Sequence, residues 1–87
     1  MFEIAETKSF IKSKDKIDKS IYEKIVKKIY PVLKENPFYG TNIKKLKGEF
    51  SQYYRYRVGD YRLFYLIDND KVLVIIVALS HRKEAYK

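Results

Sequence analysis

The chain has 87 residues, no cysteine, and a formal net charge of +8 from 19 basic and 11 acidic side chains. This length predicts one domain over residues 1–87, and the missing cysteine excludes disulfides and thiolate metal sites. The start Met1-Phe2-Glu3-Ile4 lacks the pattern of a secretory signal, and no apolar run is long enough to cross a bilayer. We therefore expect a cytoplasmic protein with no membrane association.

The first half of the sequence predicts a strand followed by two helices. Apolar and polar residues alternate from Phe2 to Glu6, as in a strand, and residues 7–16 predict a short helix. A longer amphipathic helix follows, with Asp18 as its cap, a kink at Pro31, and an end at Asn36-Pro37. Its apolar stripe contains Ile17, Ile21, Ile25, Ile29 and Leu33, widened by Tyr22 and Val26.

The second half predicts an antiparallel β-meander. Residues 38–51 read as a linker that carries the basic cluster Lys44-Lys45-Leu46-Lys47-Gly48. Three strands follow, over residues 53–58, 61–67 and 72–79. Two-residue turns at Gly59-Asp60 and Asn69-Asp70 connect them. The predicted fold class is α+β, with an N-terminal strand and two helices packed on the meander.

Three arginines are predicted to share one face of this meander. The turn at Gly59-Asp60 sets Arg57 opposite Arg62 and Arg55 opposite Phe64. The opposite face, a floor for the helices, receives Tyr54, Tyr56, Val58, Tyr61, Leu63 and Tyr65. Like charges placed opposite each other destabilise a sheet, so these guanidinium groups need acidic partners or a bound anion, and the sequence offers few acids nearby. A nucleic-acid phosphate is the sharper hypothesis, and a solvated arginine face is the alternative.

The arginine face is also predicted to be apolar at its other end. A turn at Asn69-Asp70 places there Phe64, Leu66, Leu73, Ile75 and Val77. Because a monomer rarely leaves such a patch bare, we expect a protein partner to cover part of it.

The end of the chain supplies further polar groups. His81 is the only histidine, and Arg82, Lys83 and Tyr86 follow it. Beside the three arginines, these groups fit phosphodiester chemistry in which the RNA 2′-hydroxyl is the nucleophile. A structural role for His81 is the alternative. Since the carboxylates are scattered, we expect neither a metal nor another cofactor.

Three sequence blocks resemble the RelE/ParE superfamily of type II toxin–antitoxin systems. They are Lys45-Leu46-Lys47-Gly48, the block from Tyr54 to Tyr65, and His81-Arg82-Lys83-Glu84-Ala85-Tyr86. The resemblance implies the RelE-like microbial RNase fold and a toxin neutralised by a cognate antitoxin. It also implies a metal-independent endoribonuclease that cuts mRNA in the ribosomal A site, leaving a 2′,3′-cyclic phosphate and inhibiting translation.

The resemblance also implies roles for individual residues. Arg62 looks like the arginine that stabilises the transition-state phosphate, and Arg82 like the second catalytic arginine, for charge stabilisation or leaving-group protonation. Tyr86 looks like the tyrosine that acts as base or stacks on a nucleobase. Arg55 stands at a catalytic-region lysine, and Arg57 at a basic position that grips the backbone. Further candidates for phosphate contacts are Lys45, Lys47 and Lys83.

This sequence departs from the family pattern at three positions. A second lysine of RelE falls at Tyr53, which cannot replace its charge, and Lys44 stands about where YoeB-type members use a glutamate base. The role of His81 is open between a base and a structural hydrogen bond. Two other functions therefore remain: a ParE-like inhibitor of DNA gyrase with the same fold, and a nucleic-acid-binding relative without catalysis.

Overall fold

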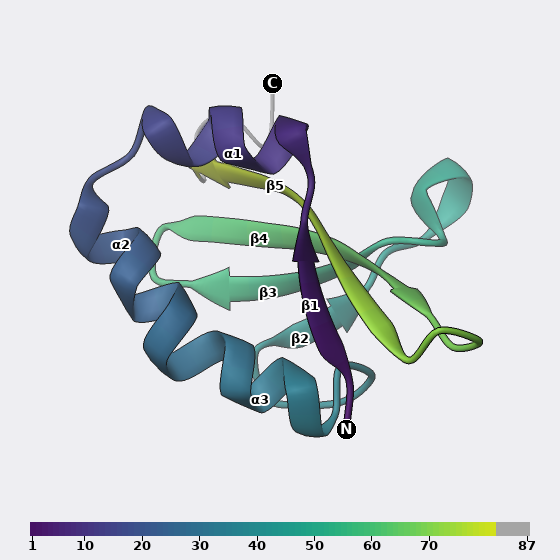
Figure 1. Cartoon of the computed structure of the whole chain (residues 1–87). Coiled ribbons are helices and arrows are strands. Elements are labelled where there is room, and N and C mark those ends of the chain that lie inside the picture. The colour runs from purple at the N-terminus through teal and green to yellow at the C-terminus, as the bar shows by residue number, and fades with distance from the viewer. Residues whose placement is uncertain (82–87) are drawn as a thin grey trace.

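The computed structural model describes residues 1–81 and contains a five-stranded sheet in the order β1-β5-β4-β3-β2. The strands are β1 (Glu3–Glu6), β2 (Ile43–Lys45), β3 (Tyr54–Val58), β4 (Tyr61–Asp68) and β5 (Leu73–His81). β1 runs parallel to β5, and the other neighbouring pairs are antiparallel. β5 therefore lies inside the sheet between β1 and β4, as Figure 1 shows, which explains why its sequence is apolar on both faces.

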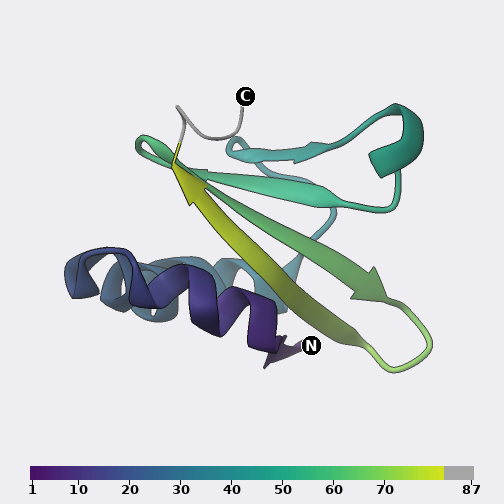
Figure 2. The same ribbon diagram turned by 90° about the horizontal axis from the view of Figure 1, so that it is seen from above.

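The helices that precede β2 cover one face of the sheet, and within residues 1–81 no helix covers the opposite face in the same way, which is called the open face below (Figure 2). The helices are α1 (Lys8–Asp15), α2 (Lys19–Lys24), η1 (Ile25–Ile29) and α3 (Tyr30–Glu35). The core between the two layers contains Phe10, Ile25, Ile29, Tyr30, Leu33, Val58, Leu63, Tyr65, Val74, Ile76 and Leu79. The predicted α+β class and the layering are thus confirmed. Within residues 1–81, no helix combines the length and apolar character needed to span a bilayer.

The segments α2, η1 and α3 follow one another as the predicted amphipathic helix. Asp18 caps it as expected, accepting a hydrogen bond from the Ser20 backbone N–H at 3.0 Å. Proline lacks an N–H and clashes with the carbonyl four residues earlier, so a regular helix cannot pass through Pro31. The chain forms a π turn just before it, in which the Tyr30 N–H reaches the Ile25 carbonyl. Of the predicted stripe, Val26 is wrongly placed, because it is 40% exposed.

The first hairpin of the meander has the predicted register. Arg57 pairs with Arg62, and Arg55 pairs with Phe64. Gly59 takes a φ of 58°, a left-handed conformation that glycine adopts without steric cost. The tyrosines that alternate with the arginines face the helices, where Tyr65 is fully buried. The first hairpin therefore separates its side chains into a core face and an open face.

The second hairpin differs from the prediction in its loop and in its register. The pairing of Asp68 with Leu73 leaves a loop of residues 69–72 in place of a two-residue turn. The loop closes with Val72 at a φ of 52°. A register shift then follows between Phe64 and Tyr65, where the pairing passes from Ala78 to Ile76. The loop is two residues longer than predicted. Because side chains alternate with a period of two, this difference keeps each residue on its predicted face, and Phe64 and Val77 lie on the open face as predicted.

The segment predicted as a linker contains two short elements. β2 pairs with β3 at the sheet edge, and a 3-10 turn, η2 (Gly48–Phe50), follows. Backbone hydrogen bonds hold this turn against the sheet: the Leu46 N–H donates to the Tyr53 carbonyl at 3.0 Å, and the Tyr53 N–H donates to the Phe50 carbonyl at 2.9 Å. The predicted linker therefore adds an edge strand and a turn to the sheet.

Candidate functional site

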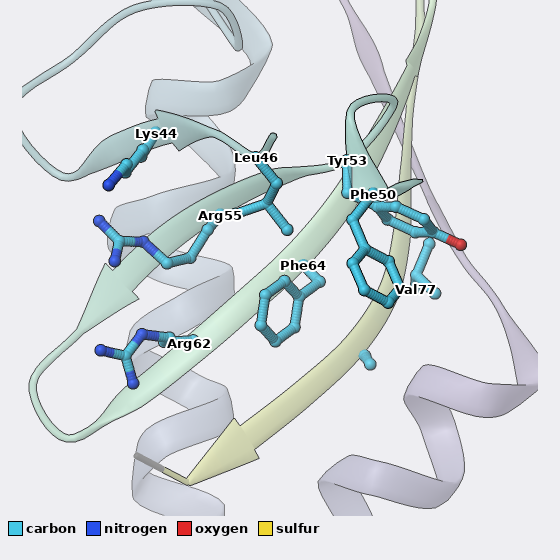
Figure 3. A pocket seen from close by; sticks show the side chains of 9 residues that line it. Lys44, Leu46, Phe50, Tyr53, Arg55, Arg62, Phe64 and Val77 are labelled. Carbon is cyan, nitrogen blue, oxygen red and sulfur yellow. The ribbon is translucent and has the colours of Figure 1, made fainter. Parts of the chain in front are cut away.

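The open face of the sheet contains a pocket of about 580 Å³. Its wall comes from four strands, β2 to β5, together with the turn η2. The lining residues are Lys44, Leu46, Phe50, Tyr53, Arg55, Arg62, Phe64, Val77 and Ala78. Figure 3 shows a basic end and an apolar end.

Three cations form the basic end of the pocket. Lys44 on β2 pairs with Arg55 on β3, and Arg62 comes from the adjacent strand β4. Figure 3 shows the two guanidinium groups side by side and pointing the same way, with the Lys44 side chain on the same side. In the described part of the chain, no acidic residue lines the pocket. Positive charge is therefore concentrated at this end of the pocket.

The Arg55 side chain is held by packing. Its Nε is buried and has no hydrogen-bond partner among residues 1–81. A buried donor without an acceptor costs roughly 1–3 kcal/mol. The side chain lies between Lys44 and Phe64 at the boundary of the two ends (Figure 3). The Arg55 guanidinium is thus presented on the open face next to Lys44.

The apolar end of the pocket is aromatic. The rings of Phe50 and Tyr53 meet edge to face with 6.3 Å between their centroids. Phe64 lies between them and the arginines, and Val77 contributes an aliphatic wall (Figure 3). This apolar lining continues directly into the cationic end, so one ligand can contact both.

The structure separates the predicted phosphate-binding residues. Arg55 and Arg62 line the pocket together, whereas Arg57 is exposed on the same face and Lys47 is exposed before η2; neither lines it. Lys45 faces the other way, with its Nζ 5.9 Å from the centre of the Tyr54 ring. Its neighbour Lys44 lines the pocket in the position that was expected for Lys45. Alternation along β2 would have identified Lys44 if that strand had been recognised.

His81 does not share the pocket with the two arginines. Its ring meets Tyr61 edge to face at 5.0 Å, and both residues line a second cavity of about 430 Å³. That cavity also includes Lys12 and Lys16 near helix α1. The structure thus places the imidazole in a different cavity from Arg55 and Arg62, because His81 pairs with Tyr61, whose side chain faces the helices; a catalytic role for His81 stays a prediction.

The other predicted site residues belong to the tail. Arg82, Lys83 and Tyr86 lie outside the described residues. Within residues 1–81, no group of three or more histidine and carboxylate side chains is placed to hold a metal ion. The part of the site that the structure describes is thus a cationic and aromatic pocket.

Comparisons with known proteins agree with this architecture. The family model described as the ParE toxin of the type II toxin–antitoxin system parDE matches residues 4–86. The RelE1 protein of Methanocaldococcus jannaschii is 38% identical over 63 residues, covering 70% of this chain and 69% of that protein.

Two solved complexes share the fold. The RelBE2 toxin–antitoxin complex from Mycobacterium tuberculosis matches with a TM-score of 0.82 and 26% identity, over 93% of this chain and 98% of that chain. The RelB–RelE antitoxin–toxin complex from Methanococcus jannaschii gives a TM-score of 0.73 and 30% identity, over 93% of each chain. Since the family match covers nearly the whole sequence, the chain belongs to the ParE toxin family, within the RelE/ParE superfamily of type II toxin–antitoxin toxins.

Proposed function

We propose that this toxin is a metal-independent endoribonuclease that cleaves mRNA in the ribosomal A site. The observation that carries the proposal is the placement of Arg55, Arg62 and Lys44 around one pocket whose described lining contains no acid. Three cations from three strands create a strong positive potential at one point, which favours an RNA phosphate over a neutral ligand. The solved RelE-type relatives support the assignment by their fold and family.

The proposed reaction is an internal transesterification. The 2′-hydroxyl oxygen attacks the adjacent phosphorus and loses its proton to a base, while the bond from phosphorus to the 5′-oxygen breaks and that oxygen takes up a proton. The products are a 2′,3′-cyclic phosphate and a 5′-hydroxyl end. Negative charge grows on the phosphoryl oxygens in the transition state, so fixed guanidinium groups lower the barrier.

We assign charge stabilisation to Arg62, with Arg55 and Lys44 holding the phosphate. Following the family resemblance, Arg82 supplies a second positive charge or protonates the leaving oxygen, and Tyr86 acts as the base or stacks on a nucleobase. His81 is proposed as a support for the end of β5, since its ring packs on Tyr61. This replaces the role of base considered from the sequence.

Primer extension on mRNA from cells that express the toxin tests this proposal. Wild-type protein is expected to produce discrete cuts within translated codons. Arg62→Ala should reduce cutting by roughly 10²- to 10³-fold, the usual effect of removing one transition-state donor. Lys28→Ala on the helical layer removes the same charge and should leave the cuts unchanged. Equal cutting by wild type and Arg62→Ala would refute the assignment of the site.

A second candidate function is inhibition of DNA gyrase, because the matching family model is that of ParE toxins. This function would give DNA damage in expressing cells without cuts in mRNA. Supercoiling assays with purified gyrase, run beside the primer extension, separate the two functions. We also propose a cognate antitoxin as partner, since the two matching solved structures are toxin–antitoxin complexes.

A further inference from the structure

We infer that Phe50 and Tyr53 form a platform on which a nucleobase of the bound RNA stacks. The inference rests on the proposed RNA substrate and adds a subsite to it. The sequence resemblance placed a lysine of RelE at Tyr53, so this part of the pocket differs from that pattern in chemical character. An aromatic surface here contacts a base, whereas a lysine would contact a phosphate.

The first argument is the exposure of Phe50. Its side chain is 55% exposed at the edge of a pocket, although a phenyl ring is normally buried. The backbone that carries this ring is held in the turn η2 by hydrogen bonds from Ser51 N–H to the Gly48 carbonyl at 3.1 Å and from Tyr53 N–H to the Phe50 carbonyl at 2.9 Å. Gly48 permits this turn with a φ of 70°. A hydrogen-bonded turn therefore presents an apolar ring at the edge of the pocket, where a flat ligand would cover it.

The second argument is the orientation of the two rings. The Phe50 and Tyr53 rings have an interplanar angle of 60°, so they meet edge to face and are not stacked on each other. In this arrangement the edge of one ring contacts the other, and at least one ring keeps its faces free of its neighbour. A flat base can stack on such a face whatever its identity, because every base has a π-surface.

The third argument is the continuity between the platform and the cations. Phe64 and Leu46 lie between the aromatic rings and the arginines along the pocket wall (Figure 3). A nucleotide unites an anionic phosphate and a flat apolar base in the same way. An acidic protein segment would also be attracted to the cations, but it has no general need for flat rings. The combination therefore favours RNA as the occupant of this end.

The experiment uses the full chain and RNA that cannot be cut. The chain has no tryptophan, so Phe50→Trp introduces a single indole whose fluorescence reports stacking. The probes are a 2′-O-methyl hexa-adenylate and a hexamer of the same backbone without bases. We expect the adenylate to quench the indole and the abasic hexamer to leave it unchanged. Absence of quenching at millimolar adenylate would overturn the platform.

Affinity measurements on unlabelled variants provide an independent test. Phe50→Ala should weaken adenylate binding on the order of 10-fold, with no change for the abasic hexamer. Tyr39→Ala is the matched control, because Tyr39 is 81% exposed and lies outside the pocket lining. If Phe50→Ala leaves adenylate binding unchanged, the apolar end belongs to a protein partner and the inference fails. The proposed cleavage is judged separately, from the effect of Arg62→Ala on primer extension.

Discussion

The side chains of two adjacent lysines on β2, Lys44 and Lys45, point to opposite faces of the sheet. Lys44 lines the pocket, whereas Lys45 lies over the Tyr54 ring. We predict that Lys44→Ala weakens RNA binding by about 1 kcal/mol, roughly five-fold, because one phosphate contact is lost. Lys45→Ala removes the same charge and should bind RNA like the wild type. Titration of both variants with 2′-O-methyl RNA checks this, and equal losses would mean that overall charge decides binding.

The buried hydroxyl of Tyr65 makes the stability of the fold depend on pH in the alkaline range. The side chain is fully buried and its hydroxyl donates to the Pro37 carbonyl at 2.7 Å. Burial raises the pKa of Tyr65 above its ordinary value of 10.0. Above pH 10 the unfolded chain therefore releases this proton while the folded chain retains it. The stabilisation is complete below that pH, and it is lost as the pH rises toward the folded pKa.

We predict that the free energy of unfolding falls with rising pH above about pH 10 and that Tyr65→Phe removes part of this fall. One retained proton corresponds to about 1.4 kcal/mol per pH unit. At neutral pH the same variant should be less stable by about 1 kcal/mol, because the Pro37 carbonyl loses its donor. Urea unfolding from about pH 8 to about pH 11 measures both effects. If the free energy of unfolding falls equally with pH in wild type and variant, Tyr65 does not cause the fall.

At the scale of elements, Thr7 joins β1, α1 and β5. Its hydroxyl accepts the Phe10 backbone N–H at 3.1 Å as the cap of α1, and it donates to the Ile76 carbonyl at 3.0 Å. We predict that Thr7→Ala destabilises the fold by about 2 kcal/mol, since both the cap and the link to β5 are lost. Thr7→Ser keeps the hydroxyl and should recover most of that stability. Chemical denaturation compares them, and equal losses would show that the methyl group matters instead.

The sequence predicted well those parts of the sheet that depend on residues close together in the chain. The first hairpin was predicted with its register because Gly59-Asp60 fits a two-residue turn and alternation then assigns each face. The loop of the second hairpin, residues 69–72, was not predicted, because Val72 takes a left-handed backbone conformation that β-branched residues disfavour. β2 has three residues, and its pairing depends on β3. Similarly, the parallel contact of β1 with β5 joins segments far apart in the sequence.

The same distinction applies to the candidate site. Arg55 and Arg62 were identified because both belong to the predictable hairpin. Lys44 and Phe50 were missed, since their positions depend on β2 and η2, which carry little periodic signal. His81 is the last residue of β5, and the pairing of β5 with β4 determines which face of the sheet its side chain leaves, so the sequence alone did not place it in the cavity with Tyr61.

For the whole molecule, the sheet separates two groups of positive charge. Lys44, Arg55 and Arg62 lie on the open face, whereas the helical layer carries solvated lysines such as Lys24, Lys27 and Lys28. Charges on both faces attract RNA at long range, but only those in contact with phosphates displace bound counterions. The dependence of affinity on salt therefore reveals which face binds RNA.

We predict different salt dependence for two variants with equal net charge. Replacing the three open-face cations by glutamine should lower the slope of log affinity against log salt by about 2, because each phosphate contact on single-stranded RNA contributes about 0.7. Replacing the three helical lysines by glutamine should leave the slope close to that of the wild type. Binding of 2′-O-methyl RNA over a series of salt concentrations measures the slopes. Equal reductions in the two variants would show that contacts with RNA extend over both faces, and the pocket would then not be the centre of binding.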